Sequence, residues 1–151
     1  MGDLKHVLVR WVKGKEFETT TESGHHVITD ASLQYGGTNH GPSPMELLLG
    51  CLGSCTGISV VDILLKKRQA VTAFEMHVEG RIADTYPKVY SDLEVIYFVH
   101  GKNISPKAVD EAIALSREKY CSISEMLAKS ARLTMRYEIV EEADDPQGTG
   151  N

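Results

Sequence analysis

Hydrophobic residues alternate with polar ones over residues 72–84 and 89–100, and short runs rich in residues of high β propensity recur over residues 6–30. The turn signals Ser23-Gly24 and Tyr86-Pro87 divide these stretches. The pattern predicts an N-terminal antiparallel meander, a later hairpin and a strand near the end of the chain. The predicted strands cover residues 6–12, 16–22, 25–30, 72–84, 89–100 and 132–140.

Between these regions, hydrophobic residues run from Pro44 to Leu65 without alternation, and cations follow at residues 66–68. Ser43-Pro44-Met45-Glu46 has the form of a capping box with proline at the first helical position, and the cations suit a helix C-terminus. These features predict one long helix. Because it is apolar on nearly every side, it must be covered all round, which a single small domain can hardly do. We therefore expect a homodimer.

Glycines interrupt this predicted helix at Gly50, Gly53 and Gly57. Each glycine weakens a helix by about 1 kcal/mol relative to alanine, so a packing reason for them is expected. The sequence therefore predicts that another backbone comes close to the helix at these positions.

Two further helices are predicted after the hairpin. Ser105-Pro106 begins a helix that ends near Lys119, and the capping box over residues 122–125 begins a short helix through Ala131. The order of meander, buried helix, hairpin, two helices and strand predicts an α+β fold. We expect a single domain over residues 1–140 and a disordered, acidic, glycine-rich tail over 141–151.

The charge balance narrows the classes of partner. The chain has 151 residues and a net charge of −5, which argues against nucleic acid or an anionic membrane as its main partner. The first residues lack the apolar core of a signal peptide, and the long apolar stretch contains Glu46, Asp62 and two cysteines, so it predicts a buried helix and no membrane span. Three cysteines without an export signal indicate a reducing compartment, so we expect a cytoplasmic protein.

The cysteines are the strongest candidates for chemistry. Cys51 and Cys55 share one face of the long helix, where free cysteine often does no more than pack. Cys121 immediately precedes the predicted N-cap Ser122, where unpaired amides and the positive helix end favour a thiolate. The alternative is that Cys121 fills the corner between two helices.

Other groups could assist or replace a thiol site. Glu46 caps the long helix and lies roughly 13 Å from Cys55 along its axis, so a joint role needs a shared cleft or a mediating group. A cation could come from the first hairpin, although solvated surface is the alternative for each candidate: Arg10, Lys13 and Lys15. A zinc site formed by the three cysteines and one histidine is also conceivable, but the spacing is not that of a standard zinc motif.

Two segments resemble a known family. Residues 41–55, GPSPMELLLGCLGSC, are similar to the central helix of the OsmC/Ohr family, and residues 119–124, KYCSIS, are similar to its second cysteine segment. The order of elements also matches, so the resemblance covers residues 5–140. The YhfA-like OsmC proteins are the branch that the chain resembles most.

The resemblance implies an OsmC/Ohr-like fold, an intertwined homodimer in which antiparallel sheets surround buried central helices. It also implies a thiol-dependent peroxidase that reduces organic hydroperoxides without a cofactor or metal. Cys55 would form a sulfenic acid, Cys121 would resolve it as a disulfide, and a dithiol reductant would restore both thiols. Glu46 and Arg10 would be the assisting residues, and Cys51 would be a core residue.

The chain departs from the family pattern around the thiols. Arg10 lies upstream of the hairpin turn that carries the family's arginine, and Glu46 is one position later than the family's glutamate, which rotates it by about 100°. Ser122 replaces the proline that usually follows the second cysteine. A second hypothesis is therefore a non-catalytic OsmC-like dimer that binds a small hydrophobic ligand. A buried Cys55 thiol with a raised pKa would argue against the peroxidase.

Overall fold

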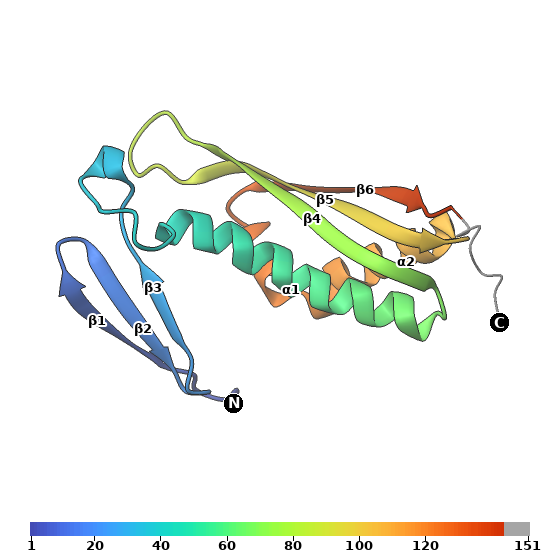
Figure 1. Cartoon of the computed structure of the whole chain (residues 1–151), viewed down its shortest axis with the longest axis horizontal. Coiled ribbons are helices and arrows are strands. Elements are labelled where there is room, and N and C mark those ends of the chain that lie inside the picture. The colour runs from blue at the N-terminus through green and yellow to red at the C-terminus, as the bar shows by residue number, and fades with distance from the viewer. Residues whose placement is uncertain (144–151) are drawn as a thin grey trace, which may run out of the picture. The chain divides into compact units, whose positions relative to one another are not determined.

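The computed structural model describes residues 1–143 and divides into two compact units, Met1–Leu48 and a second unit that begins at Leu49 (Figure 1). The predicted tail over residues 141–151 begins too early, because Glu141 is the last residue of a strand. Residues 144–151 of that predicted tail lie outside the described residues.

The first unit contains the predicted antiparallel meander. Its strands are β1 (Val7–Lys13), β2 (Glu16–Thr21) and β3 (His26–Thr29), paired in the order β1-β2-β3. The turn between β2 and β3 falls at the predicted Ser23-Gly24, where Gly24 has a φ of 86° that favours glycine. The meander is therefore confirmed.

A buried carboxylate organises the loop between β3 and the long helix. Asp30 accepts hydrogen bonds from the backbone N–H groups of Ala31 (2.7 Å), Thr38 (3.1 Å) and His40 (3.2 Å). It also accepts one from the Thr38 hydroxyl (2.7 Å), and that bond is the largest cause that lowers the pKa of Asp30 to about 2. The loop, which includes a 3₁₀ turn at Leu33–Tyr35, is thus held by one ionised side chain.

The long helix α1 (Pro44–Lys66) begins and ends as the sequence predicts. The N–H of Ser43 donates to Glu46 Oε2 (2.8 Å) and the N–H of Glu46 donates to Ser43 Oγ (3.2 Å), so the capping box is confirmed. Among the helices of residues 1–143, α1 alone is long and apolar enough to cross a bilayer. The core helix of a soluble protein can have the same length and composition. Its Thr56 hydroxyl bonds to the Tyr97 hydroxyl of the sheet at 2.7 Å, as in a core helix.

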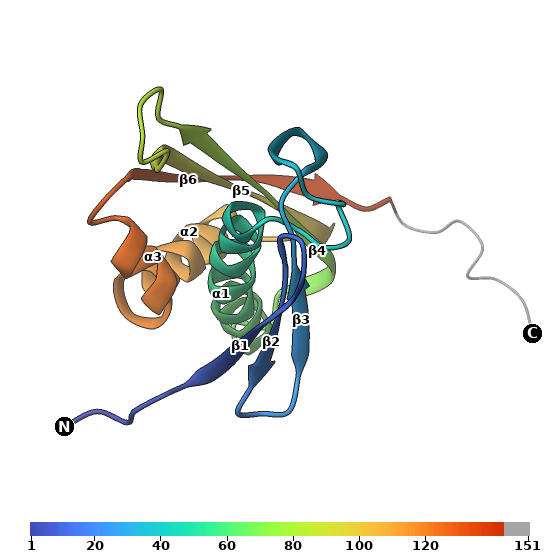
Figure 2. The same ribbon diagram turned by 90° about the vertical axis from the view of Figure 1, so that its left-hand side faces the viewer.

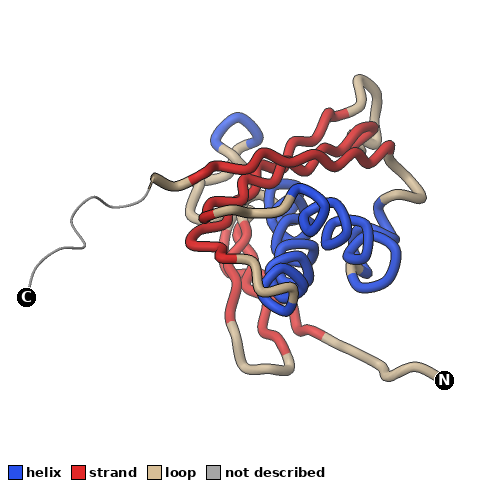
Figure 3. The backbone as a smooth tube through the Cα atoms, turned by 90° about the vertical axis from the view of Figure 1, so that its right-hand side faces the viewer, coloured by secondary structure: helices blue, strands red, loops and turns tan. Residues whose placement is uncertain are grey.

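The second unit is a sheet with helices on one of its faces (Figures 2 and 3). Its strands are β4 (Ala70–Ile82), β5 (Tyr90–Lys102) and β6 (Arg132–Glu141), in the order β4-β5-β6. The predicted hairpin of β4 and β5 is antiparallel, but β6 runs parallel to β5, so the expectation of antiparallel sheets is wrong for this pair. The intervening helices form the crossover that a parallel pair requires.

The glycines of α1 meet side chains of β4. A Cβ on Gly53 would lie 2.9 Å from Val78 Cγ2, and a Cβ on Gly57 would lie 2.5 Å from Met76 Cε. A Cβ on Gly50 would have no atom within 4 Å. The prediction of close packing is thus confirmed for two of the glycines, with side chains as neighbours and not the expected backbone.

The region between β5 and β6 differs in detail from the prediction. Helix α2 (Pro106–Leu115) starts at the predicted Ser105-Pro106, but the chain then forms a π-helical turn, Ser116–Tyr120. Helix α3 (Ser122–Leu127) ends before the predicted Ala131. Its N-cap is Cys121 and not Ser122, so the predicted capping box over residues 122–125 is wrong by one residue.

Candidate functional site

The structure brings Cys55 and Cys121 together within one chain. Cys55 is half-buried on α1, and Cys121 is 2% exposed at the start of α3. The Cys121 thiol lies close enough to the Cys55 thiol to raise its pKa, although the residues are far apart in the sequence. The two cysteines that the sequence singled out are therefore neighbours in space.

The first turn of α3 directs its free N–H groups at the two sulfur atoms. The N–H groups of Ile123 and Ser122 lie close enough to the Cys55 sulfur to lower its pKa, and the N–H of Ser124 donates to Cys121 Sγ (3.4 Å). These are the amides that have no partner within a helix. Because α3 spans only Ser122–Leu127, the interaction comes from direct amide contacts more than from a long helix dipole.

Burial raises the pKa of the Cys55 thiol above its ordinary value, and the nearby Cys121 thiol adds to the increase. The N–H groups of Ile123 and Ser122 lower it, but not enough to cancel the effect of burial. Cys55 is therefore mainly a protonated thiol at neutral pH. Because the thiolate is the nucleophile, this finding argues against a fully activated peroxidase site within the second unit.

A groove beside Cys55 offers space for a small apolar molecule. It runs along α1 from Cys55 to the C-terminal end of that helix. The charged groups at this end are already paired, since Lys66 Nζ lies 2.6 Å from Asp62 Oδ2 and Lys67 pairs with Glu111. The groove is lined by Cys55, Ile58, Ser59, Asp62, Ile63, Lys66, Lys67, Leu115 and Tyr120.

A buried cluster of hydroxyl groups beside the thiols was missed by the sequence reasoning. Thr56 Oγ1 lies 2.7 Å from Tyr97 Oη and 3.1 Å from Ser116 Oγ, and Ser59 Oγ lies 2.5 Å from Ser116 Oγ. The available signal was the presence of Thr56 and Ser59 inside an otherwise apolar helix, since buried hydroxyls need partners.

The predicted assisting residues lie in the first unit. The Glu46 carboxylate is occupied in the α1 cap, and the N–H and hydroxyl of Ser43 lower its pKa. Arg10 is exposed on β1, opposite Glu18 in the strand register. Of the other hairpin cations, Lys15 donates to the backbone oxygen of Tyr35. Catalytic assistance by Glu46 and Arg10 stays a prediction.

The remaining cysteine does not extend the site. Cys51 is half-buried on α1. Among residues 1–143, no three or more histidine, cysteine, aspartate or glutamate side chains are grouped so that they could hold a metal ion. The zinc alternative therefore finds no ligand set in the described part of the chain.

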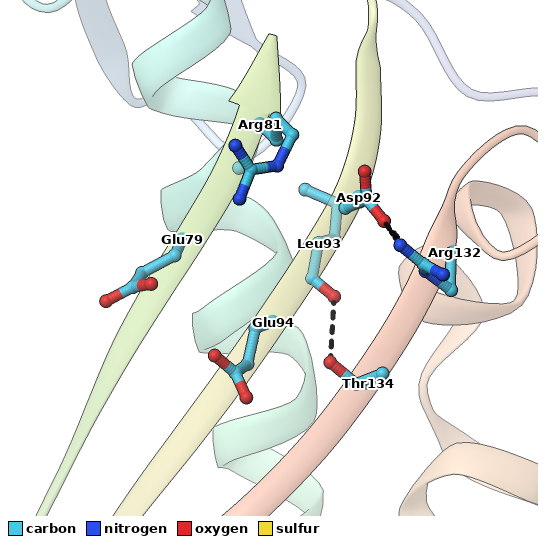
Figure 4. A pocket seen from close by; sticks show the side chains of 8 residues that line it. Glu79, Arg81, Asp92, Leu93, Glu94, Arg132 and Thr134 are labelled. Carbon is cyan, nitrogen blue, oxygen red and sulfur yellow. Dashed lines mark hydrogen bonds and ion pairs between the residues drawn. The ribbon is translucent and has the colours of Figure 1, made fainter.

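A second concavity lies on the β4-β5-β6 sheet and has a different character (Figure 4). It is lined by charged side chains, and Arg132 Nε donates to Asp92 Oδ1 at 2.7 Å. Thr134 Oγ1 donates to the backbone oxygen of Leu93 at 3.4 Å. Since this concavity contains no nucleophilic sulfur, the thiol pair remains the candidate redox site.

Comparisons with known proteins agree with the resemblance found in the sequence. The family model described as OsmC-like protein matches residues 37–136. Protein YhfA of Escherichia coli strain K12 is 36% identical over 132 residues, which cover 87% of this chain and 96% of YhfA.

Solved structures share the fold. A hypothetical protein from Aquifex aeolicus VF5 is 32% identical with a TM-score of 0.82, over 94% of this chain and 100% of that chain. An organic hydroperoxide resistance protein from Elizabethkingia anophelis is 12% identical with a TM-score of 0.67, over 93% of this chain and 100% of that chain. At that identity the likeness concerns the fold alone.

Proposed function

This chain belongs to the OsmC-like protein family, and from this premise we propose that it is a thiol-dependent peroxidase that reduces organic hydroperoxides. Cys55 is the attacking residue and Cys121 the resolving residue. The observation that carries the proposal is the proximity of these two thiols within one chain. The names of structural relatives as organic hydroperoxide resistance proteins support the choice of substrate.

The proposed reaction has two steps. The Cys55 thiolate attacks the outer oxygen of a hydroperoxide ROOH, the O–O bond breaks, the alcohol ROH leaves with a proton, and Cys55 becomes a sulfenic acid. The Cys121 sulfur then attacks the Cys55 sulfur, which forms a disulfide and releases water. An external dithiol returns the pair to the reduced state by thiol–disulfide exchange and is itself oxidised to a disulfide.

The raised pKa of Cys55 sets a condition on the first step. Because burial keeps most of this side chain protonated, only the minor thiolate fraction reacts, and the rate must rise as the pH increases. Glu46 and Arg10 are the proposed assisting residues, and their contribution can be measured as the loss of rate in Glu46→Gln and Arg10→Ala. A loss smaller than about twofold in both would remove them from the mechanism.

We also propose that the protein is a homodimer. The outward face of α1 carries Ile58, which is 75% exposed, and Leu65, which is 56% exposed. Trp11 on β1 is 66% exposed. Apolar surface of this extent favours coverage by a second copy. Light scattering of purified protein tests the idea: a mass of one chain at micromolar concentration would contradict it.

A second candidate function rests on the same site. The raised pKa of Cys55 and the partly apolar groove beside it favour a non-catalytic dimer that holds a small hydrophobic ligand. In that case Cys55 would line the binding groove without being oxidised, and peroxide would leave the thiols unchanged.

One experiment separates the two candidates. Free thiols and intact mass are measured before and after one equivalent of cumene hydroperoxide, on wild type, Cys55→Ser and Cys121→Ser, with Cys51→Ser as the matched control. The peroxidase predicts loss of two thiols and of two mass units in wild type and Cys51→Ser, no reaction of Cys55→Ser, and a sulfenic acid in Cys121→Ser. Unchanged thiols in wild type, also at pH 9, would favour the ligand-binding protein.

A further inference from the structure

Four hydroxyl groups, three of them fully buried and that of Ser59 part-buried, join the helix that carries Cys55 to the turn that precedes Cys121. Thr56 and Ser59 lie on α1, Ser116 begins the π-helical turn, and Tyr97 lies on β5. Thr56, Tyr97 and Ser116 are fully buried. Every link in the cluster is between 2.5 and 3.1 Å long, so these hydroxyls form a continuous hydrogen-bonded chain.

The donor and acceptor roles of these hydroxyl groups can be assigned from Tyr97, whose hydroxyl also contacts a sulfur atom. Tyr97 Oη donates to Met135 Sδ at 3.4 Å, because a thioether sulfur can only accept. Tyr97 must then accept from Thr56, which has one proton and so accepts from Ser116. Ser59 Oγ donates to the Thr56 carbonyl oxygen at 3.0 Å and lies 2.5 Å from Ser116 Oγ, where either hydroxyl can be the donor. Ser116 is therefore hydrogen-bonded through its side chain to two residues of the helix that carries Cys55, Thr56 and Ser59.

The backbone of Ser116 makes a separate contact with the second cysteine. The N–H of Cys121 donates to the Ser116 carbonyl oxygen at 2.7 Å and closes the π-helical turn. One residue thus contacts the backbone of Cys121 directly and is tied through its side chain to Thr56, the residue after Cys55.

We propose that Ser116 is a positioning residue that sets the approach of the Cys121 sulfur to the Cys55 sulfur. The inference rests on the proposed function for its role in turnover, but the arrangement of the two thiols can be measured without a peroxide. Ser116 acts through its side-chain hydrogen bonds to Thr56 and Ser59, which hold the π-helical turn against α1, and none of these bonds involves a sulfur atom.

Loss of these bonds should separate the two chemical steps. In Ser116→Ala the Cys55 thiolate still attacks the hydroperoxide, because its own contacts are retained. Closure of the disulfide becomes slower, so the sulfenic acid persists. A second hydroperoxide can then oxidise it to the sulfinic acid and leave as its alcohol.

The first test measures the disulfide equilibrium with dithiothreitol, which reports the approach of the sulfurs without peroxide. Ser116→Ala is compared with wild type in mixtures of reduced and oxidised dithiothreitol, all in a Cys51→Ser background. The expected result is a shift of about two- to tenfold toward the dithiol, the range that a lost hydrogen bond supports. Tyr97→Phe is the matched control, because it removes a hydroxyl of the same cluster and leaves both bonds between Ser116 and α1.

The second test adds cumene hydroperoxide and dimedone, which traps sulfenic acids, and measures the ratio of adduct to disulfide by mass. The expected ratio rises in Ser116→Ala and not in Tyr97→Phe. If Ser116→Ala does not fold, Thr56→Val removes one of the partner hydroxyls with little change of shape and should give a smaller shift in the same direction.

The outcomes distinguish this inference from the proposed function. Equal equilibrium constants in wild type and Ser116→Ala would overturn the positioning role, as would an equal shift in Tyr97→Phe. A wild type that forms the disulfide with oxidised dithiothreitol but does not react with hydroperoxide would overturn the peroxidase and leave the positioning role supported.

Discussion

The sulfur of Cys121 accepts the backbone N–H of Ser124, so the residue proposed to resolve the sulfenic acid is also the N-cap of α3. Serine is among the best N-cap residues, whereas alanine cannot cap. We therefore predict that reduced Cys121→Ser is more stable to urea than Cys121→Ala by about 1 kcal/mol. Equal unfolding midpoints would show that a capping side chain contributes little to stability at this position. Either result shows which variant suits the redox experiments.

The reactivity of Cys55 should increase with pH. Burial raises its pKa, so the thiolate is a small fraction at pH 7 that grows about tenfold per pH unit below the pKa. Alkylation by iodoacetamide, followed by mass spectrometry of the Cys55 peptide, should accelerate continuously from pH 6 to 9. A rate that reaches a plateau below pH 7 would mean that a positive charge lowers the pKa, for instance one contributed by a second subunit.

The ionised side chain of Asp30 should make the free energy of unfolding depend on pH in the acidic range. Its pKa falls from an ordinary value of 3.8 to about 2 in the folded protein, mainly through the Thr38 hydroxyl. A depressed pKa stabilises the fold above pH 3.8, and this contribution is lost as the pH falls toward 2. Asp30→Asn should lower stability at neutral pH and show a smaller further loss across that window. Asp3→Asn, at an exposed position, is the control and should behave as wild type.

Gly53 and Gly50 should respond in opposite ways to alanine. A Cβ on Gly53 would press against Val78, whose branched side chain has little freedom to move, so we expect Gly53→Ala to cost about 1–3 kcal/mol. Gly50 has open space within the chain, and Gly50→Ala should gain up to about 1 kcal/mol from helix propensity. Urea denaturation measures both. A loss of stability in Gly50→Ala that deepens on dilution would instead locate Gly50 in the contact between subunits.

The elements that the sequence predicted are those with strong local signals. The capping box of Ser43 and Glu46 marks the start of α1, and turn residues separate the strands of the meander. The direction of β6 was not predictable, because alternation identifies a strand but not the partner beside it. The N-cap of α3 was displaced by one residue because Ser122 is a stronger capping type than Cys121.

The candidate site was only partly predictable. Cys55 and Cys121 stood out as residue types. Their proximity could not be predicted, because it depends on how the segment between β5 and β6 places Cys121 beside α1. The raised pKa of Cys55 depends on burial, which no local pattern of residues records. Ser116 carried no motif, and its role emerges only when Thr56 is seen opposite it.

The π-helical turn at Ser116–Tyr120 also has a consequence for how relatives of this chain should be compared. Such a turn accommodates one more residue than an α-helical turn, so it is equivalent to a single-residue insertion in a helix. Deleting one residue there would restore α-helical continuity and rotate Cys121 by about 100° away from its present direction. A homologue with that deletion would retain both cysteines in an alignment and yet lose their pairing. The proximity of the two thiols in such chains therefore depends on the number of residues in this turn as well as on their identity.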